Sequence, residues 1–294
     1  MSALSVIFSG TMLAQTVRMA IPYTCAATGG VLSERSGVVN IALEGILLAS
    51  ALASIAVHIA TGNAAAGVMA GVGCGAAIGV LHATLVVRGR IDAIVSGLAI
   101  NLAAAGGTRF MLRALYGSSS NSDAAPSFHA PFVDPFLVAT VLAVAASAWM
   151  LQRTRFGLRL RACGEDPSAA QAVGIHVVFV RTAGVALGGA VCGLGGTALA
   201  YDLHQFQAGM SGGRGFIALA AVIVSGWNPT RAAVACLAFA GLDALQIVLQ
   251  NQTRVPSQAL AVLPFVATLF ALVLVGMRRS SDLRPPAGLG RHPD

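Results

Sequence analysis

RTRFGLRLRACGEDPSAAQAVGIH, residues Arg153 to His176, is the one long charged segment in an otherwise apolar chain. Its first nine residues include four arginines that directly follow a hydrophobic run. Asp166 and Pro167 then supply the N-cap and first-turn proline of a short helix, which Gly174 can end. Such a helix, placed between two membrane spans, lies outside the bilayer. The segment therefore predicts a docking surface on which a partner protein can push.

The rest of the chain has the composition of a membrane protein. Of its 294 residues, 56% are hydrophobic and 10% are charged, and the mean hydropathy is +0.78. A soluble domain carries far more charge than this. Because each spanning helix needs about 20 residues, the chain has room for about eight to ten spans. We therefore expect an all-α polytopic membrane protein with little chain left for a domain outside the membrane.

Nine apolar runs define the expected helices. They cover residues 3–21, 38–60, 64–87, 91–115, 134–152, 180–201, 216–226, 231–249 and 257–277. The run at 216–226 is too short for an upright span, so a half-helix or a tilted helix is expected there. The first run lacks the flanks of a signal peptide and is predicted to be a retained span. Residues 1–277 thus form a single transmembrane domain with a cytoplasmic segment at 153–180, and the Pro- and Gly-rich tail at 278–294 is predicted to be disordered.

The basic residues predict the orientation of the chain. All 18 are arginines, and alternating sides through the nine runs puts 14 of them inside. The other four, Arg109, Arg113, Arg214 and Arg254, lie outside. This excess follows the positive-inside rule and predicts a multi-pass membrane protein with an outside N-terminus and a cytoplasmic C-terminus. The net charge of +7 therefore reflects membrane orientation and not nucleic-acid binding.

Several function classes are excluded by what the sequence lacks. Without a lysine, the chain cannot form a standard Walker A loop, so any ATP must be hydrolysed by another subunit. The five cysteines are scattered without metal-ligand spacing and are predicted to be packing residues. The sequence also has no HExxH or GxSxG motif. We therefore predict neither an enzyme nor a metal or cofactor site in this chain.

Glycines predict close packing between helices. Gly67, Gly71, Gly75 and Gly79 recur every fourth residue, which removes the side chains from one helix face. A neighbouring backbone can approach such a face closely. A second cluster between Gly184 and Gly196 predicts the same packing, or a helix that must flex or slide.

Five polar residues within or beside apolar runs are candidates for substrate binding: Asn40, Glu44, Asn101, Asp243 and Gln246. Glu44 lies about two turns inside its helix, where an ionisable group tends to face a cavity or a partner. A salt bridge to Arg35 is the alternative for Glu44, and Asn40 can instead cap a broken helix. For the other three, a hydrogen bond between helices is the alternative to a ligand contact.

The two halves of the chain share a faint pattern. Gly29–Gly30 precedes a polar interruption and an apolar run, and Gly195–Gly196 precedes a longer interruption and the run from Gly215. The expected topology places the two interruptions on opposite membrane faces. An inverted repeat has this arrangement, and transporters built from such repeats carry discontinuous helices at corresponding positions.

Three blocks of sequence resemble a known family, the permease subunits of bacterial ABC importers in the branched-chain amino acid and simple-sugar superfamily. They are GGVLSERSGVVNIALEG (29–45), FGLRLRACGEDPSAAQAVGI (156–175) and GGRGFIALAAVIVSGWNP (212–229). The likeness spans nearly the whole chain and implies the fold of a type II ABC importer permease. The first block is similar to nucleoside permeases, which implies nucleoside cargo; relatives for sugars, amino acids or riboflavin-like compounds are the alternatives. Ala42 and Ser225 stand where glycine is usual in close relatives.

The resemblance also implies partners. These are a second permease chain, identical or homologous, an ABC ATPase that uses the ATP, and an external substrate-binding lipoprotein, all assembled among membrane lipids. Coupling to the ATPase is implied for Arg159, Arg161, Glu165, Asp166, Pro167 and Gly174. The competing function class is a self-sufficient secondary transporter, in which Glu44 or Asp243 carries a coupling ion.

Overall fold

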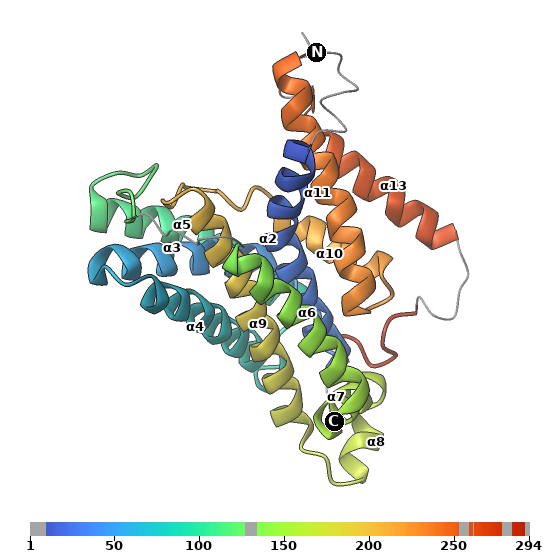
Figure 1. Cartoon of the computed structure of the whole chain (residues 1–294). Helices are drawn as coiled ribbons and strands as arrows, with labels where there is room; N and C mark the ends of the chain where they lie inside the picture. The colour runs from blue at the N-terminus through green and yellow to red at the C-terminus, as the bar shows by residue number, and fades with distance from the viewer. Residues whose placement is uncertain (1–9, 127–133, 253–258, 261, 278–283, 292–294) are drawn as a thin grey trace.

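The computed structural model describes residues 10–126, 134–252, 259–260, 262–277 and 284–291. Its helices are α2 (Gly10–Arg35), α3 (Leu43–Thr61), α4 (Ala64–Ala83), the π-helical turn η1 (Thr84–Arg88), α5 (Ala93–Tyr116), α6 (Pro135–Arg153), α7 (Arg155–Glu165), α8 (Pro167–Ala172), α9 (Val177–Asp202), α10 (Arg214–Val224), α11 (Pro229–Gln252) and α13 (Leu263–Met277) (Figure 1). In these ranges the β-structure is limited to one isolated bridge, between Asn121 and Gln207. The prediction of an all-α fold is therefore confirmed.

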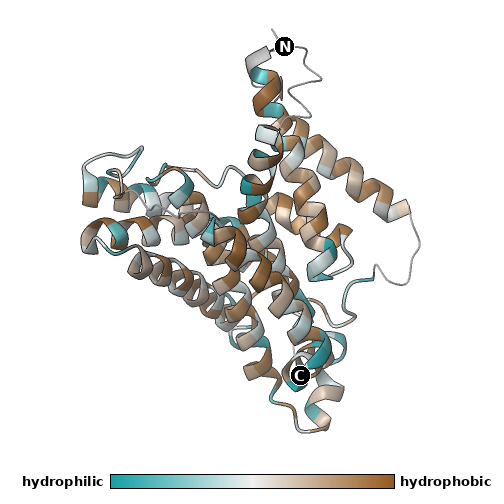
Figure 2. Cartoon of the chain, viewed as in Figure 1, coloured by the Kyte–Doolittle hydropathy of each residue, from teal (hydrophilic) through white to brown (hydrophobic). Residues whose placement is uncertain are grey.

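The helices match the apolar runs of the sequence, and each of the nine runs overlaps one helix. Six are long and apolar enough to cross a membrane: α3, α4 with η1, α5, α6, α9 and α11. Figure 2 shows hydrophobic residues along most of these helices and hydrophilic residues gathered at α7. Helix α10 has 11 residues, as expected for the half-helix.

Helix α2 differs from its prediction because it continues to Arg35, well beyond the apolar run that ends at residue 21. Every residue from Ala20 to Glu34 is buried, so the polar side chains in this stretch face other helices and not lipid. Hydropathy alone therefore placed the end of this helix too early. The break falls at residues 36–42, and Gly29–Gly30 lies inside a continuous helix.

Helix α9 packs against α2 and α4 through backbone contacts at glycines. A Cβ atom added to Gly188 would collide with the carbonyl oxygen of Gly29, and one added to Gly189 would collide with that of Gly75. All four glycines of the α4 stripe are buried. This confirms the close packing predicted from their spacing, and it makes α9 the centre of the helix assembly.

Gly75→Val is expected to lower the thermal stability of the protein. The new side chain would collide with the backbone of Gly189 and Gly193 in α9, and overpacking of this kind costs about 1–3 kcal/mol. Gly73→Val in the same helix is the matched control, because a Cβ atom added at Gly73 would meet no described atom within 4 Å beyond the backbone of its own helix. Thermal unfolding of the two purified variants in detergent tests this, and equal midpoints would contradict it.

Two polar contacts show which helix ends lie on the same side of the membrane. Arg18 at the start of α2 pairs with Asp202 at the end of α9, with 3.3 Å between Nη1 and Oδ1. At the opposite end of α2, Arg35 Nε donates to the carbonyl oxygen of Trp227 at 2.9 Å. Arg18 therefore belongs to the outer side of the membrane, which corrects the prediction that it lies inside. The correction gives 13 arginines inside and five outside of the 18, so the predicted orientation is unchanged.

Residues 284–291 also differ from their prediction, because they lie in an ordered path against α7 (Figure 1). The amide of Gly288 donates to the carbonyl of Gly164 at 2.9 Å, and the amide of Gly290 donates to that of Gly37 at 3.0 Å. The glycines that suggested disorder instead allow this close approach. A Cβ atom at Gly288 would lie 2.8 Å from the Gly164 oxygen, and Gly290 has a φ of +76°. The rest of the predicted disordered tail, 278–283 and 292–294, is outside the described residues.

Candidate functional site

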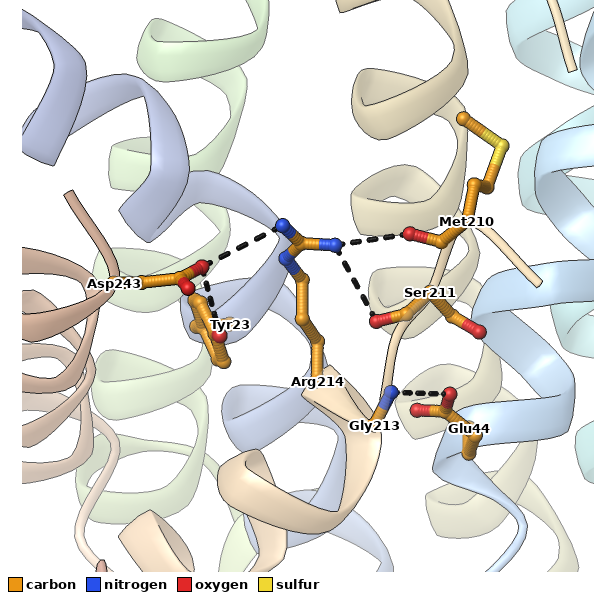
Figure 3. A network of polar contacts seen from close by, with 7 residues as sticks. All are labelled: Tyr23, Glu44, Met210, Ser211, Gly213, Arg214 and Asp243. Carbon is orange, nitrogen blue, oxygen red and sulfur yellow. Dashed lines mark hydrogen bonds and ion pairs between the residues drawn. The ribbon is translucent and has the colours of Figure 1, made fainter. Parts of the chain in front are cut away.

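The N-terminus of the half-helix α10 is held by the carboxylate of Glu44. Glu44 Oε1 accepts a hydrogen bond from the amide of Gly213 at 2.8 Å (Figure 3). Glu44 Oε2 accepts one from the amide of Gly215 at 2.7 Å. The first amides of a helix lack partners within the helix, and its dipole favours a negative charge there. Glu44 thus anchors α10 to the start of α3. Each of these two helices is preceded by a non-helical segment.

This contact replaces the salt bridge to Arg35 that the sequence allowed for Glu44. Arg35 instead donates to the carbonyl oxygens of Gly226 and Trp227, beyond the other end of α10. The close approach at Glu44 requires glycine at position 215, where a Cβ atom would lie 2.6 Å from the Cα of Glu44. The half-helix is therefore fixed at both ends by residues of the first half of the chain.

Asn40 and Asn101 stabilise the break between α2 and α3. Asn40 is fully buried, and its amide donates to Ser33 Oγ at 3.0 Å while its Oδ1 accepts from the amide of Ala42 at 3.2 Å. Asn101 on α5 accepts from the amide of Gly45 at 2.7 Å and donates to the carbonyl of Ile41 at 2.9 Å. Both side chains therefore bond to groups of the break itself. The N-cap of α3 is Ala42, without a side-chain cap hydrogen bond, so Asn40 stabilises the break but does not cap α3.

Asp243 belongs to a second polar cluster, which joins α2, α10 and α11. Arg214 Nη2 lies 3.5 Å from Asp243 Oδ2, and the Tyr23 hydroxyl donates to the same oxygen at 3.2 Å (Figure 3). Arg214 also donates to the carbonyl oxygen of Met210 at 2.9 Å, and its guanidinium carbon lies 5.8 Å from the centre of the Tyr23 ring. The ring therefore adds a cation–π contact to the ion pair. Gln246, three residues along α11, is half-buried.

A cavity of about 610 Å³ lies above this cluster, next to the outer ends of α2 and α9. It is lined by Arg18, Met19, Ile21, Pro22, Asp134, Pro135, Phe136, Ala198, Leu199, Tyr201, Asp202, Leu203, His204, Gln207, Met210 and Arg214. Arg214 connects the cavity to the Asp243 cluster. The five predicted substrate-binding residues are not part of this lining, so a direct contact between any of them and a substrate stays a prediction.

The charged side chains that line the cavity are already engaged. Arg18 pairs with Asp202, and Arg214 pairs with Asp243. Asp134 accepts a hydrogen bond from the amide of Phe136 at 2.9 Å and so caps α6. Each of these four charged residues and Asp134 thus has at least one partner, while Nε of Arg214 is buried without a hydrogen bond among the described residues. The neutral donors and acceptors of the wall are therefore the main groups open to a solute.

The predicted docking segment forms two helices, α7 and α8. Asp166 is the N-cap of α8, with its Oδ1 accepting from the amide of Ala169 at 3.0 Å, and Pro167 is the first residue of the helix. Gly174 follows α8 with a φ of +83°. The start, the first turn and the end of this helix are therefore confirmed as predicted from local sequence.

The other residues expected to couple to an ATPase lie on α7. Arg159 and Glu165 are exposed, whereas Arg161 is half-buried. Glu165 accepts a hydrogen bond from the amide of Ala287 at 3.0 Å. This carboxylate therefore contacts the chain's own segment 284–291, a role that the sequence did not indicate.

Comparison with known proteins identifies the family. A model described as the permease component of the branched-chain amino acid transport system matches residues 12–275. The chain belongs to this permease family. It is 34% identical over 284 residues to the guanosine ABC transporter permease protein NupQ of Bacillus subtilis, covering 87% of this chain and 89% of NupQ. It is also 34% identical over 280 residues to the nucleoside ABC transporter permease protein NupC of Lactococcus lactis, covering 86% and 88%.

Membership in this family fixes the general role of the chain. It is the permease subunit of an ABC transporter in the cell membrane, and a separate ATPase subunit hydrolyses the ATP. The predictions of a multi-pass transporter subunit without its own ATPase are therefore confirmed. The spanning helices of the permease support the same conclusion.

Two residues of the Asp243 cluster, Arg214 and Tyr23, were not among the candidates predicted from the sequence. Arg214 was assigned to an outer loop, and Tyr23 lay beyond the predicted end of its helix. The available signal was Asp243, because a carboxylate inside an apolar helix requires a cationic or hydrogen-bonding partner. Arg214 starts the half-helix, where such a cation can reach membrane depth.

Proposed function

We propose that the permease forms the translocation path for nucleosides and that the outer cavity receives the nucleoside on its way in. The observation that carries this proposal is the pairing of the charges in the cavity wall. A neutral solute with several hydroxyl and ring nitrogen groups suits such a wall. Two relatives of the permease are named as guanosine and nucleoside permeases, which supports the same cargo.

The cavity also argues against charged cargo. Its volume of about 610 Å³ is within the range of small-molecule sites, about 300–1,000 Å³. A phosphorylated nucleotide would need an unpaired cation, and an amino acid would need partners for both of its charges. Either cargo would compete with the Arg18–Asp202 or the Arg214–Asp243 pair for its charges. A nucleoside leaves both pairs intact.

We further propose that α8 receives the motion of the ATPase. Helix α8 is short, capped at its start and exposed along residues 171–174. Closure of the ATPase on ATP binding would displace α8 and shift the helices packed against it between outward-open and inward-open arrangements. A second permease chain and an external substrate-binding lipoprotein complete the proposed complex.

Radiolabelled uridine and adenosine uptake tests the cargo. The assay uses a transport-deficient bacterium that expresses the neighbouring ATPase, permease and binding-protein genes with or without this chain. Uptake that requires the chain, and that unlabelled nucleosides but not uridine monophosphate or leucine inhibit, is expected. An assembled complex that takes up glucose or leucine but no nucleoside would overturn the nucleoside proposal.

Asp166→Ala is expected to reduce nucleoside uptake by about tenfold, while the complex still assembles in the membrane. The loss of the N-cap costs α8 about 0.5–2 kcal/mol, so the helix transmits the motion of the ATPase poorly. Ser168→Ala is the control, because Ser168 is an exposed neighbour in the same helix. Uptake and ATP hydrolysis are measured together. Normal uptake in the Asp166 variant would contradict the role of α8.

A further inference from the structure

We propose that residues 284–291 act as a clasp that ties the coupling helix α8 to α2 and α9, so that displacement of α8 is transmitted to these two helices. The inference rests on the proposed coupling role of α8. It assigns a mechanical function to a segment that lies outside the part of the chain matched by the family model, which ends at residue 275.

The clasp contacts the permease through its backbone. The amides of Ala287 and Gly288 donate to the carboxylate of Glu165 and the carbonyl of Gly164, at the end of α7. The amide of Gly290 donates to the carbonyl of Gly37, just after α2. Hydrogen bonds from three backbone amides, at residues 287, 288 and 290, fix the position of the segment against the permease. The segment nevertheless forms no helix or strand.

Gly288 brings the clasp against the coupling helix itself. It is buried, and a Cβ atom at this position would lie 3.0 Å from the Cδ of Pro167, the first residue of α8. Leu289 packs against the large hydrophobic core cluster, which includes buried residues of α2 and α9. The clasp therefore touches α8 on one side and the core of the permease on the other.

Arg181 of α9 provides the strongest reason for the clasp to stay in place. Its side chain is 2% exposed, and its guanidinium donates to the carbonyl of Arg291 at 2.6 Å and to that of Cys163 at 2.9 Å. Within the described residues it pairs with no carboxylate. If the clasp leaves, this buried cation loses one of its two carbonyl acceptors, and an unpaired buried charge is costly.

Gly37 fits the same arrangement. It has a φ of +95°, and a Cβ atom there would lie 2.6 Å from Arg181 Nη2. Gly37, two residues after the end of α2, thus leaves room for the Arg181 guanidinium and also accepts a hydrogen bond from the clasp. The C-terminal ends of α2 and α7 and the N-terminal end of α9 therefore meet at the clasp, and α8 starts beside it. This junction gives α8 a direct mechanical link to α2 and α9, the two longest helices among the described residues, each of 26 residues.

Gly288→Leu tests the clasp, with Ala287→Leu as the matched control. The leucine at 288 would collide with Gly164 and Pro167, whereas Ala287 is exposed and binds only through its amide. Both variants are assembled with the ATPase and the other subunits. Hydrogen exchange of the amides in 284–291 reports release of the clasp, and deletion of 284–294 serves as a second variant that removes it. Copurification of the ATPase, ATP hydrolysis and nucleoside uptake are then measured.

The expected result in Gly288→Leu is faster exchange of the amides in 284–291. Uptake is expected to fall by about tenfold in Gly288→Leu and in the deletion, which is within the range typical for coupling between distant sites. ATPase copurification and ATP hydrolysis stay near wild-type levels, and Ala287→Leu behaves as wild type. Normal uptake in the deletion variant would overturn the clasp. Loss of ATPase copurification would also overturn it, because the segment would then be part of the docking surface. Asp166→Ala distinguishes the two proposals: if it transports normally, the coupling role of α8 fails, irrespective of the clasp variants.

Discussion

Nucleoside uptake is expected to fall by about 100-fold when Arg214 is replaced by methionine. The substitution leaves the Asp243 carboxylate, whose side chain is only 15% exposed, with the Tyr23 hydroxyl and no cation. Removing one partner of a buried pair costs about 3–5 kcal/mol, and about 3 kcal/mol corresponds to about 100-fold in an equilibrium. Arg214 also lines the outer cavity and is the first residue of α10. The substitution is therefore expected to disturb both the cavity wall and the position of the half-helix.

A double-mutant cycle separates folding from transport in this prediction. Adding Asp243→Leu to Arg214→Met removes the unpaired charge, and we expect this to recover most of the lost thermal stability. Uptake is expected to stay low, because the link between α10 and α11 is still missing. Arg113→Met, at an exposed arginine near the outer end of α5, controls for the loss of positive charge. Recovery of uptake in the double variant would show that the pair serves stability alone.

The features that the sequence predicted well depend on local chemistry. The cap and first-turn proline of α8 act within a few residues, so Asp166 and Pro167 could be placed from the sequence alone. The α4 glycine stripe needs only its spacing of four to define a packing face. The lengths of the apolar runs likewise predicted the spans, because lipid requires a minimum helix length.

The features that the sequence missed depend on partners far along the chain. Glu44 is 169 residues from Gly213, and Tyr23 is 220 residues from Asp243. Nothing in the local pattern around Glu44 distinguishes a residue that caps a half-helix from one that faces a cavity. Helix α2 was cut short for the same reason, because burial by other helices allows polar residues that lipid does not.

The segment 284–291 shows how composition misleads when the partner surface is unknown. Proline and glycine lower the ability of a chain to form helices, and this predicted disorder. The same glycines allow the contact: a Cβ atom at Gly288 would collide with the Gly164 oxygen, and Gly290, which bonds to Gly37, has a φ of +76° that favours glycine. Composition describes the propensity of the segment, whereas the carbonyls of the permease core decide its conformation.

Glu44→Ala is expected to reduce uptake by about 100-fold as well. The change leaves the amides of Gly213 and Gly215 without their acceptor at the start of α10. Hydrogen bonds to a charged group are worth about 1.5–3 kcal/mol each, and the helix dipole adds about 0.3–1 kcal/mol. We therefore expect the first turn of α10 to open, with faster hydrogen exchange at residues 213–216. Asp123→Asn, an exposed carboxylate on the outer side, is the control.

Glu44→Gln distinguishes this anchoring role from ion coupling. The glutamine oxygen can still accept from one amide, but its NH₂ group faces the other, so an intermediate loss of uptake and of amide protection is expected. The two measurements should fall together across the alanine and glutamine variants, because both report the attachment of α10. If Glu44→Gln abolished uptake while residues 213–216 stayed protected, the charge itself would be needed for transport. Glu44 would then act as a carrier of protons or cations, and the anchoring role would not explain its place inside the membrane.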